Sequence, residues 1–317
     1  GRINFRFYPD PTARMLALQA QEVDLITDVA KQSASQVEAS GGSLLTSPVG
    51  AYEAFYINIH GEQPYDLGQD PAVREAVALA VDKEAVVNGA WQGNAEPGTT
   101  MIPPAILGSA GDIIESAPFD LARAGQVLEG AGWIAGDDGV RAKDGRRLEL
   151  VLINGFATAA DHGSVPELLQ AQLAEAGIAV EIVQTPDTAT YEARLQTGEG
   201  DLWLEAGTQN DGNPCFLPDL LFTTPAPDDD PESTAYGRAF APGEAFDAHI
   251  TACREAVEVG EVQQAAAEAM KLLIDDEHVV VPLCGFYRIL GVLPKVTALD
   301  VHPSGVNQRW TSLTLET

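Results

Sequence analysis

The segment 148–183 constrains the fold of this chain more than any other part of the sequence. It holds an apolar run at 148–153, a helical pattern at 165–176 and a second apolar run at 178–183 that follows Gly177 directly. Short apolar runs of this kind are typical of strands buried on both faces. A strand–helix–strand unit with short connections predicts two parallel strands joined by a right-handed crossover. We therefore expect an α/β fold.

A second well-defined element begins at Asp70. Asp70 suits the N-cap position of a helix, and Pro71 suits the first helical position after it. The apolar residues that follow recur at a helical spacing and share one face: Val73, Val77, Ala80 and Val81. The preceding segment, 60–71, is rich in Gly, Pro and Asp and is typical of a linker.

The first residues of the chain predict a strand. Ile3, Phe5 and Phe7 alternate with polar residues, which is the pattern of a strand buried on one face. We interpret this opening as a point in the middle of a fold. The first five residues also lack the basic and apolar regions of a signal peptide.

The charge of the chain excludes one class of partner. It has 18 Lys and Arg against 47 Asp and Glu, a formal net charge of −29. A nucleic-acid-binding protein needs clustered basic residues to neutralise phosphates, and an anionic membrane surface attracts basic segments. We expect neither nucleic acid nor a membrane surface as a partner, and no apolar run is long enough for a transmembrane segment.

The three cysteines, Cys215, Cys253 and Cys284, permit at most one disulfide, and the sequence leaves its existence open. Cys253 lies on the apolar face of an expected helix, where we expect it to act as a small buried hydrophobic residue. No common hydrolase, nucleotide-binding or metalloprotease motif is present, so we expect no enzyme. The five histidines are dispersed, and we expect no metal site and no cofactor.

The loop 207–214, after a strand expected at 201–205, is the best candidate for a binding site. It carries hydroxyl, amide and carboxylate groups that have no use in an apolar core: Thr208, Gln209, Asn210, Asp211 and Asn213. In α/β proteins, ligands bind where polar groups converge beyond the ends of strands. The alternative is that Asn and Asp build Asx turns in this loop.

Four more residues are candidates for the same site. Asn154 and Phe156 follow the strand at 148–153, Glu205 ends the strand at 201–205, and Tyr287 follows an apolar segment near residue 282. The alternatives are an ordinary turn at 154–156 and a surface or hinge salt bridge for Glu205. Trp203 alternates with its neighbours on a strand, and we expect it to pack in the core.

Several segments, in order along the chain, resemble the family 5 solute-binding proteins of ABC importers, the peptide- and nickel-binding family. The most telling series is Asn58, Pro64-Tyr65-Asp66, Val73-Arg74-Glu75-Ala76-Val77 and Ala80-Val81-Asp82-Lys83. Gly130-Ala131-Gly132-Trp133 and Val281-Pro282-Leu283 also agree with the pattern of the family. One departure is Gln21, which stands where the family has Gly.

The resemblance implies a type II periplasmic-binding-protein-like fold, with one complete lobe plus part of the second lobe. Because members of the family are considerably longer, it also implies that this chain is a C-terminal fragment without the signal peptide. The expected division is a partial lobe I at 1–69, lobe II at 70–290 and a return to lobe I at 291–317.

The resemblance further implies the substrate-binding component of an ABC importer, which binds a peptide or similar small solute between its lobes and delivers it to the permease subunits. We expect a monomer located in the periplasm or held at the cell surface as a lipoprotein. Two alternatives stay open: a nickel-chelate-binding protein of the same family, and the ligand-sensing domain of a transcription regulator.

The loop 207–214 has a counterpart in this family that contacts the ligand. Oligopeptide binders place an Asp just before a Pro to pair the amino terminus of the peptide, and Asp211 stands three residues before Pro214. Nickel-chelate binders carry aromatic residues where Thr208 and Gly212 stand here. The resemblance therefore favours a peptide. We also expect Tyr287 and Arg288, which follow Val281-Pro282-Leu283, near the hinge between the lobes.

Overall fold

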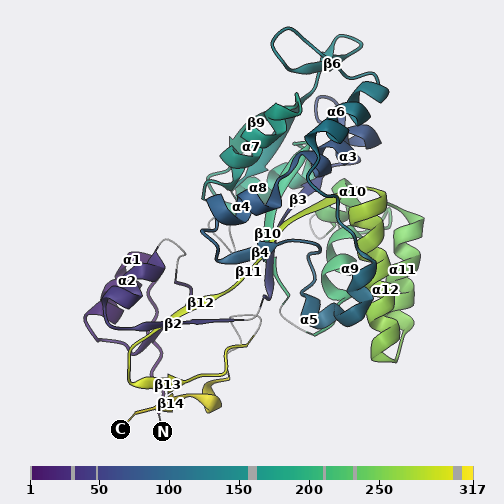
Figure 1. Ribbon diagram of the computed structural model, residues 1–317. Helices are drawn as coiled ribbons and strands as arrows, with labels where there is room; N and C mark the ends of the chain where they lie inside the picture. The colour runs from purple at the N-terminus through teal and green to yellow at the C-terminus, as the bar shows by residue number, and fades with distance from the viewer. Residues whose placement is uncertain are drawn as a thin grey trace.

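The computed structural model shows two units (Figure 1). The larger one contains β3, β10 and β11, and the smaller one contains β2, β12 and both ends of the chain. The structure describes residues 2–29, 33–47, 49–155, 163–209, 212–230, 234–302 and 309–316. Within those residues, no helix is long and apolar enough to cross a membrane.

A six-stranded sheet forms the centre of the larger unit. Its strand order is β4 (Ala95–Pro97), β11 (Val280–Phe286), β3 (Ala51–Ile57), β10 (Leu202–Thr208), β8 (Glu149–Asn154) and β9 (Ala179–Gln184). β8 pairs in parallel with both β9 and β10, and α7 (Val165–Glu175) connects β8 to β9. This confirms the strand–helix–strand unit predicted at 148–183.

Apolar layers cover both faces of the sheet. Phe55 and Ile57 of β3 face a core that includes α3 (Pro71–Ala80), α4 (Lys83–Gly89), α6 (Leu121–Gly130) and α7. Tyr52, Ala54 and Tyr56 face the opposite core, which includes α8 (Thr188–Gln196), α9 (Phe216–Phe222), α10 (Ala235–Phe240), α11 (Glu244–Glu255) and α12 (Val259–Lys271). Trp203 is fully buried in this second core, as predicted.

Helix α3 begins where its sequence predicts. Oδ1 of Asp70 accepts a hydrogen bond from the amide of Ala72 at 3.0 Å, and Pro71 occupies the first turn, where its missing N–H leaves no donor unsatisfied. The predicted apolar face is buried, with Val73, Val77 and Val81 at most 1% exposed.

The smaller unit contains a three-stranded sheet in the order β1 (Leu25–Ile26), β12 (Ile289–Val292) and β2 (Ser43–Thr46). Helices α1 (Pro11–Gln19) and α2 (Ala34–Ala39) cover it, with Leu18 and Val37 fully buried. β13 (Val296–Ala298) and β14 (Thr314–Leu315) form a separate pair near the chain ends.

The other described elements are short. The segment 94–116 contains β4, helix α5 (Pro104–Leu107) and a 3-10 helix at Gly108–Ile113. β5 (Ile134–Ala135), β6 (Arg141–Lys143) and β7 (Arg146–Arg147) form a small antiparallel sheet that projects from the larger unit (Figure 1).

The strand predicted at 3–7 is wrong. Residues 2–8 pair with no strand, and the side chains of Phe5 and Phe7 are 60% and 94% exposed. An alternating pattern becomes a strand only when a neighbouring strand accepts its backbone hydrogen bonds, and no described strand pairs with this segment. Phe5 instead packs edge-on against Trp310, with ring centroids 5.2 Å apart.

The division into 1–69, 70–290 and 291–317 stays a prediction, although sheet membership bears on where its boundaries fall. β3, within 1–69, is hydrogen-bonded into the six-stranded sheet, and β12, which straddles the predicted boundary at residue 290, is paired with β1 and β2. We propose that the boundaries lie near residues 50 and 287, where the chain passes from one sheet to the other.

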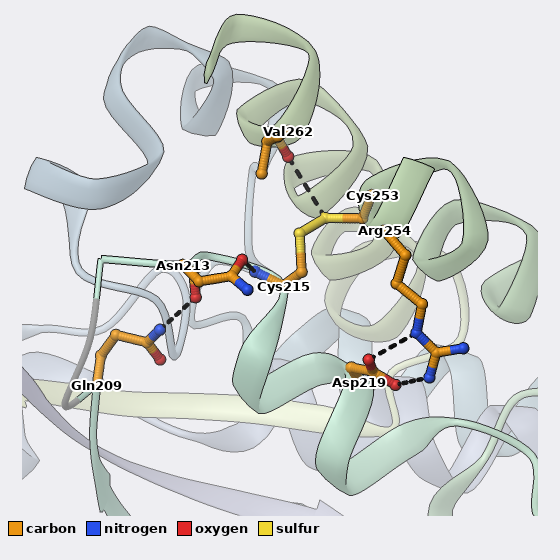
Figure 2. Close-up of a disulfide and its surroundings, with 7 residues drawn as sticks. All are labelled: Gln209, Asn213, Cys215, Asp219, Cys253, Arg254 and Val262. Atoms are coloured by element: carbon orange, nitrogen blue, oxygen red, sulfur yellow. Dashed lines mark hydrogen bonds and ion pairs between the residues drawn. A yellow bond between two sulfur atoms is a disulfide. The ribbon is translucent and has the colours of Figure 1, made fainter. Parts of the chain in front are cut away.

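One disulfide, Cys215–Cys253, joins the start of α9 to α11 (Figure 2). The expectation that Cys253 acts as a simple hydrophobic residue is therefore wrong: it is 4% exposed, but it is covalently bonded. Helical spacing shows only that a residue faces inward, and the partner comes from a separate helix. Cys284 is a buried free thiol.

Reduction of the disulfide is expected to lower the free energy of unfolding by about 2–4 kcal/mol, because the bond closes a long loop in the unfolded chain, between cysteines 38 positions apart. Thermal unfolding followed by circular dichroism, with and without a reductant, measures the effect. The double variant Cys215→Ala/Cys253→Ala is the matched control, since its melting temperature should not respond to reductant. A wild-type melting temperature that does not respond either would contradict the prediction.

Candidate ligand-binding site

Several strands of the six-stranded sheet end level with one another. Ala51, which begins β3, lies opposite Thr208 at the end of β10 and opposite Phe286 at the end of β11. Phe286 in turn lies opposite Ala95, which begins β4. These four residues mark one edge of the sheet. We call it the polar edge, because polar residues stand next to them in the chain. The chain also passes from this edge into the smaller unit, near residues 50 and 287.

β8 and β9 run parallel to β10, so their carboxyl ends at Asn154 and Gln184 point toward the same edge. Ligands of open α/β sheets bind beyond the carboxyl ends of parallel strands. These strand ends therefore face the same edge of the sheet, although Ile153 lies opposite Trp203, so that Asn154 at the end of β8 lies several residues before the level of Thr208.

A small cavity of about 40 Å³ opens at this edge. Its walls combine apolar and polar groups, among them Tyr52, Glu96, Thr99, Met101 and Ile102. Glu96 adjoins the predicted residue Tyr287, whose hydroxyl donates to Oε1 of Glu96. This hydrogen bond, with some burial, raises the pKa of Tyr287 to about 12, so its hydroxyl stays protonated at neutral pH.

Thr208 lies half-buried at the end of β10. Its Oγ1 accepts a hydrogen bond from Nη2 of Arg288 at 2.9 Å. Of the predicted loop residues that the structure describes, Thr208 is the one whose side chain joins the polar edge to the segment between β11 and β12. Asn210, Asp211 and Phe156 lie outside the described residues.

Gln209 and Asn213 hold the loop after β10 together (Figure 2). Gln209 is 3% exposed and donates from Nε2 to the carbonyl of Asn213 at 2.5 Å. Oδ1 of Asn213 accepts from the amide of Cys215 at 3.0 Å. Asn213 thus forms the Asx turn that was the alternative to ligand contact, and both residues support the shape of the loop.

Asn154 joins the ends of β8 and β9. Its Nδ2 donates to Oε1 of Gln184 at 2.8 Å, and its carbonyl accepts from the amide of Thr185 at 2.7 Å. Its Oδ1 is buried and accepts no hydrogen bond from the described residues. This oxygen is the part of Asn154 that is suited to a polar ligand group.

Glu205 lies within β10 and is 5% exposed. Its Oε1 accepts hydrogen bonds from the hydroxyls of Tyr191 and, at 2.7 Å, Tyr236. Burial, followed by the nearby carboxylate, raises the pKa of Tyr236 and keeps its hydroxyl a donor. This environment favours a role in tying α8 and α10 to the sheet over either direct ligand contact or a salt bridge.

Arg288 was expected near a hinge, and the structure places it between the two units. Its amide donates to Oγ of Ser47, and its carbonyl accepts from the amide of Ser47, both at 2.9 Å. Its Nη1 lies 3.5 Å from Oδ1 of Asp28 in the smaller unit. Arg288 therefore links both crossing segments to Thr208 on one side and to Asp28 on the other.

Lys83 was not among the predicted site residues, yet it contacts the wall of the cavity. Nζ of Lys83 donates to the carbonyl of Gly98 at 2.9 Å and to Oγ of Ser116 at 2.5 Å. Gly98 lines the cavity at the polar edge, so the hydrogen bond from Lys83 supports one wall of that cavity. The Asp82-Lys83 motif indicates a lysine at the start of a helix. It does not indicate that this lysine donates a hydrogen bond to the carbonyl of Gly98.

Among the described residues, no group of three or more His, Cys, Asp or Glu side chains is arranged to hold a metal ion. The site is instead a set of single polar groups placed at the junction of two units. The fold is therefore an α/β arrangement of two units joined by crossing segments, with polar groups gathered at the junction.

A family model, bacterial extracellular solute-binding proteins, family 5 middle, matches residues 1–228. The chain belongs to this family. Its family and fold are those of substrate-binding transport proteins, which are not enzymes.

Individual relatives agree with this assignment. The nickel-binding periplasmic protein of Escherichia coli is 26% identical over 215 residues, which is 62% of this chain and 37% of that protein. Di/tripeptide-binding protein 2 of Pseudomonas aeruginosa is 30% identical over 152 residues, which is 48% of this chain and 26% of that protein.

The fold also matches solved structures. NikA from Brucella suis in complex with Fe(III)-EDTA has a TM-score of 0.82 at 24% identity, covering 98% of this chain and 61% of that one. The likeness confirms the type II periplasmic-binding-protein fold. The chain spans about 60% of the length of such structures, so it corresponds to part of that architecture.

Burial lowers the pKa of Lys83 to about 8 from 10.5, so between these values the unfolded chain binds more protons than the folded one. The stability of the wild type is therefore expected to rise, relative to the Lys83→Met variant, by on the order of 3 kcal/mol as the pH increases from about 8 to 10.5. Urea unfolding of both proteins at several pH values measures the difference. Two stability curves that stay parallel over this range would contradict it.

Proposed function

We propose that this chain is the larger part of a solute receptor of an ABC importer, which binds a peptide at the polar edge, between its two units, and delivers it to the permease subunits. The observation that supports this most directly is the placement of Thr208, Glu96 and Arg288 around the point where the chain crosses between the units. A solute held there contacts both units and so favours their closed arrangement.

The chemistry of this edge suits a short peptide. A peptide presents an ammonium group, a carboxylate and amides, and the edge offers a carboxylate at Glu96, a guanidinium at Arg288 and a hydroxyl at Thr208. The apolar part of the neighbouring cavity, with Met101 and Ile102, suits a side chain of the solute. The di/tripeptide-binding relative from Pseudomonas aeruginosa is in keeping with this choice.

A nickel chelate is the second candidate, because the Escherichia coli relative is named for nickel binding and the Brucella structure holds Fe(III)-EDTA. The sequence of the loop after β10 favours the peptide, since Thr208 and Gly212 stand where nickel-chelate binders carry aromatic residues. We propose a location outside the cytoplasm, in the periplasm or as a cell-surface lipoprotein, and a monomeric state. The Cys215–Cys253 disulfide supports this location, because disulfides persist in oxidising compartments.

Isothermal titration calorimetry of the full natural chain with trialanine and with Fe(III)-EDTA tests the proposal. We expect trialanine to bind and the chelate not to bind, because the edge presents groups of both charges, and Thr208 and Gly212 stand where nickel-chelate binders carry aromatic residues. Native mass spectrometry of the purified protein provides an independent check by identifying any solute that it retains. Binding of Fe(III)-EDTA alone would establish the second candidate, and binding of neither compound would overturn the proposed function.

A further inference from the structure

The hydrogen bond between Arg288 and Thr208 determines what the Thr208 hydroxyl can do next. A hydroxyl has one proton to donate and two lone pairs that accept. Nη2 of Arg288 donates a hydrogen bond to one of these lone pairs, with 2.9 Å between Nη2 and Oγ1 of Thr208. Within the described part of the chain, the Thr208 hydroxyl donates to no protein group. Its proton is therefore available to an acceptor that comes from outside the protein.

The charge of Arg288 determines whether an ammonium group or an oxygen acceptor of the solute is favoured beside Thr208. An ammonium group at Thr208 would lie next to a guanidinium, and two like charges at such a distance repel each other. The side chain of Arg288 is 14% exposed, so solvent screens its charge only in part. Asp28 offsets some of this charge, but it lies 3.5 Å away with its own side chain 43% exposed. A carboxylate or carbonyl oxygen is favoured over an ammonium group.

The position of the guanidinium is fixed before any solute arrives. Two hydrogen bonds to Ser47 hold the backbone of Arg288. The guanidinium carbon also lies 5.9 Å from the ring centroid of Phe286, and that ring is stacked on Trp91 with centroids 4.3 Å apart. A donor held in this way polarises the hydroxyl that accepts from it and strengthens that hydroxyl as a donor.

We propose that Thr208 and Arg288 together recognise a carboxylate or carbonyl oxygen of the solute. Thr208 donates the hydrogen bond, and Arg288 is the positioning residue that orients the hydroxyl and sets the local charge. The inference rests on the proposed function and adds the chemical group that is bound at this end of the site. Lysine cannot replace Arg288, because its single ammonium group lacks the planar fork that reaches Thr208 and Asp28 together.

Calorimetric titration of the full natural chain with trialanine and with trialanine amide tests this proposal. Thr208→Val removes the hydroxyl while keeping the branched shape, and Thr208→Ser keeps the hydroxyl as the matched control. We expect Thr208→Val to weaken trialanine binding about tenfold or more and Thr208→Ser to stay within about threefold of the wild type. A loss on amidation identifies the carboxylate as the bound group, and equal binding of acid and amide identifies a carbonyl.

Arg288→Lys supplies a readout that loss of packing alone would not change. For a bound carboxylate, we expect the preference of the wild type for the acid over the amide to decrease in Arg288→Lys. For a bound carbonyl, we expect both peptides to weaken about as much as in Thr208→Val. Trialanine that binds Thr208→Val as tightly as the wild type would overturn the inference while leaving the proposed function intact.

Fe(III)-EDTA separates the remaining outcomes. If it alone binds the wild type, the peptide proposal fails, and the Thr208→Val and Thr208→Ser variants test the same inference on the carboxylate groups of the chelate. Equal binding of the chelate to the wild type and Thr208→Val would then overturn the inference. If the wild type binds neither compound, the proposed function and this inference both fail.

Discussion

The hydrogen bonding of β3 on both of its sides is the constraint on which the rest of the structure depends. β3 pairs antiparallel with β10 and with β11, and all seven of its residues are buried. An antiparallel strand between two neighbours that run the other way begins where they end. Ala51 therefore lies level with Thr208 and Phe286, and the groups that follow those two residues meet at a single edge.

Two buried carboxylates stiffen the sheet close to this edge. Glu53 of β3 accepts a hydrogen bond from Nε1 of Trp91 at 2.7 Å on one face, and Glu205 of β10 accepts from Tyr191 and Tyr236 on the other. Burying a carboxylate is unfavourable unless hydrogen bonds replace its water. Because the donors belong to the segments that cover the sheet, each carboxylate holds a covering layer in register with the strand beneath it.

Local patterns predicted those parts of the fold that local interactions determine. The helix after Asp70 and the parallel pair around α7 follow from a cap and from short apolar runs, and both are present. The pattern at 3–7 failed because an alternating sequence needs a neighbouring strand, which no local pattern supplies. The prediction for Cys253 was wrong for a related reason. Helical spacing shows that this side chain faces inward but does not show that its partner is Cys215.

The candidate site residues were predicted from their position at strand ends, and the contacts that each of them makes could not be predicted in this way. Thr208 and Tyr287 were chosen as polar residues after strands, and both take part in hydrogen bonds at the polar edge. Glu205 was chosen for the same reason, yet the pleat of β10 turns it into the core beside Tyr191. The partners Arg288 and Glu96 lie 80 residues or more away from Thr208 and Tyr287, so only the folded chain brings them together.

The crossing segments connect the site to movement between the units. A solute changes the balance between open and closed arrangements only by the difference in its affinity for the two. Arg288 contacts Thr208 in the larger unit and Asp28 in the smaller one, so a rotation between the units must change at least one of these distances. A solute that accepts a hydrogen bond from Thr208 contacts the same hydroxyl that accepts a hydrogen bond from Arg288. On the proposed recognition of a solute oxygen by Thr208, we therefore expect the free energy of binding to depend on the angle between the units through the side chain of Arg288.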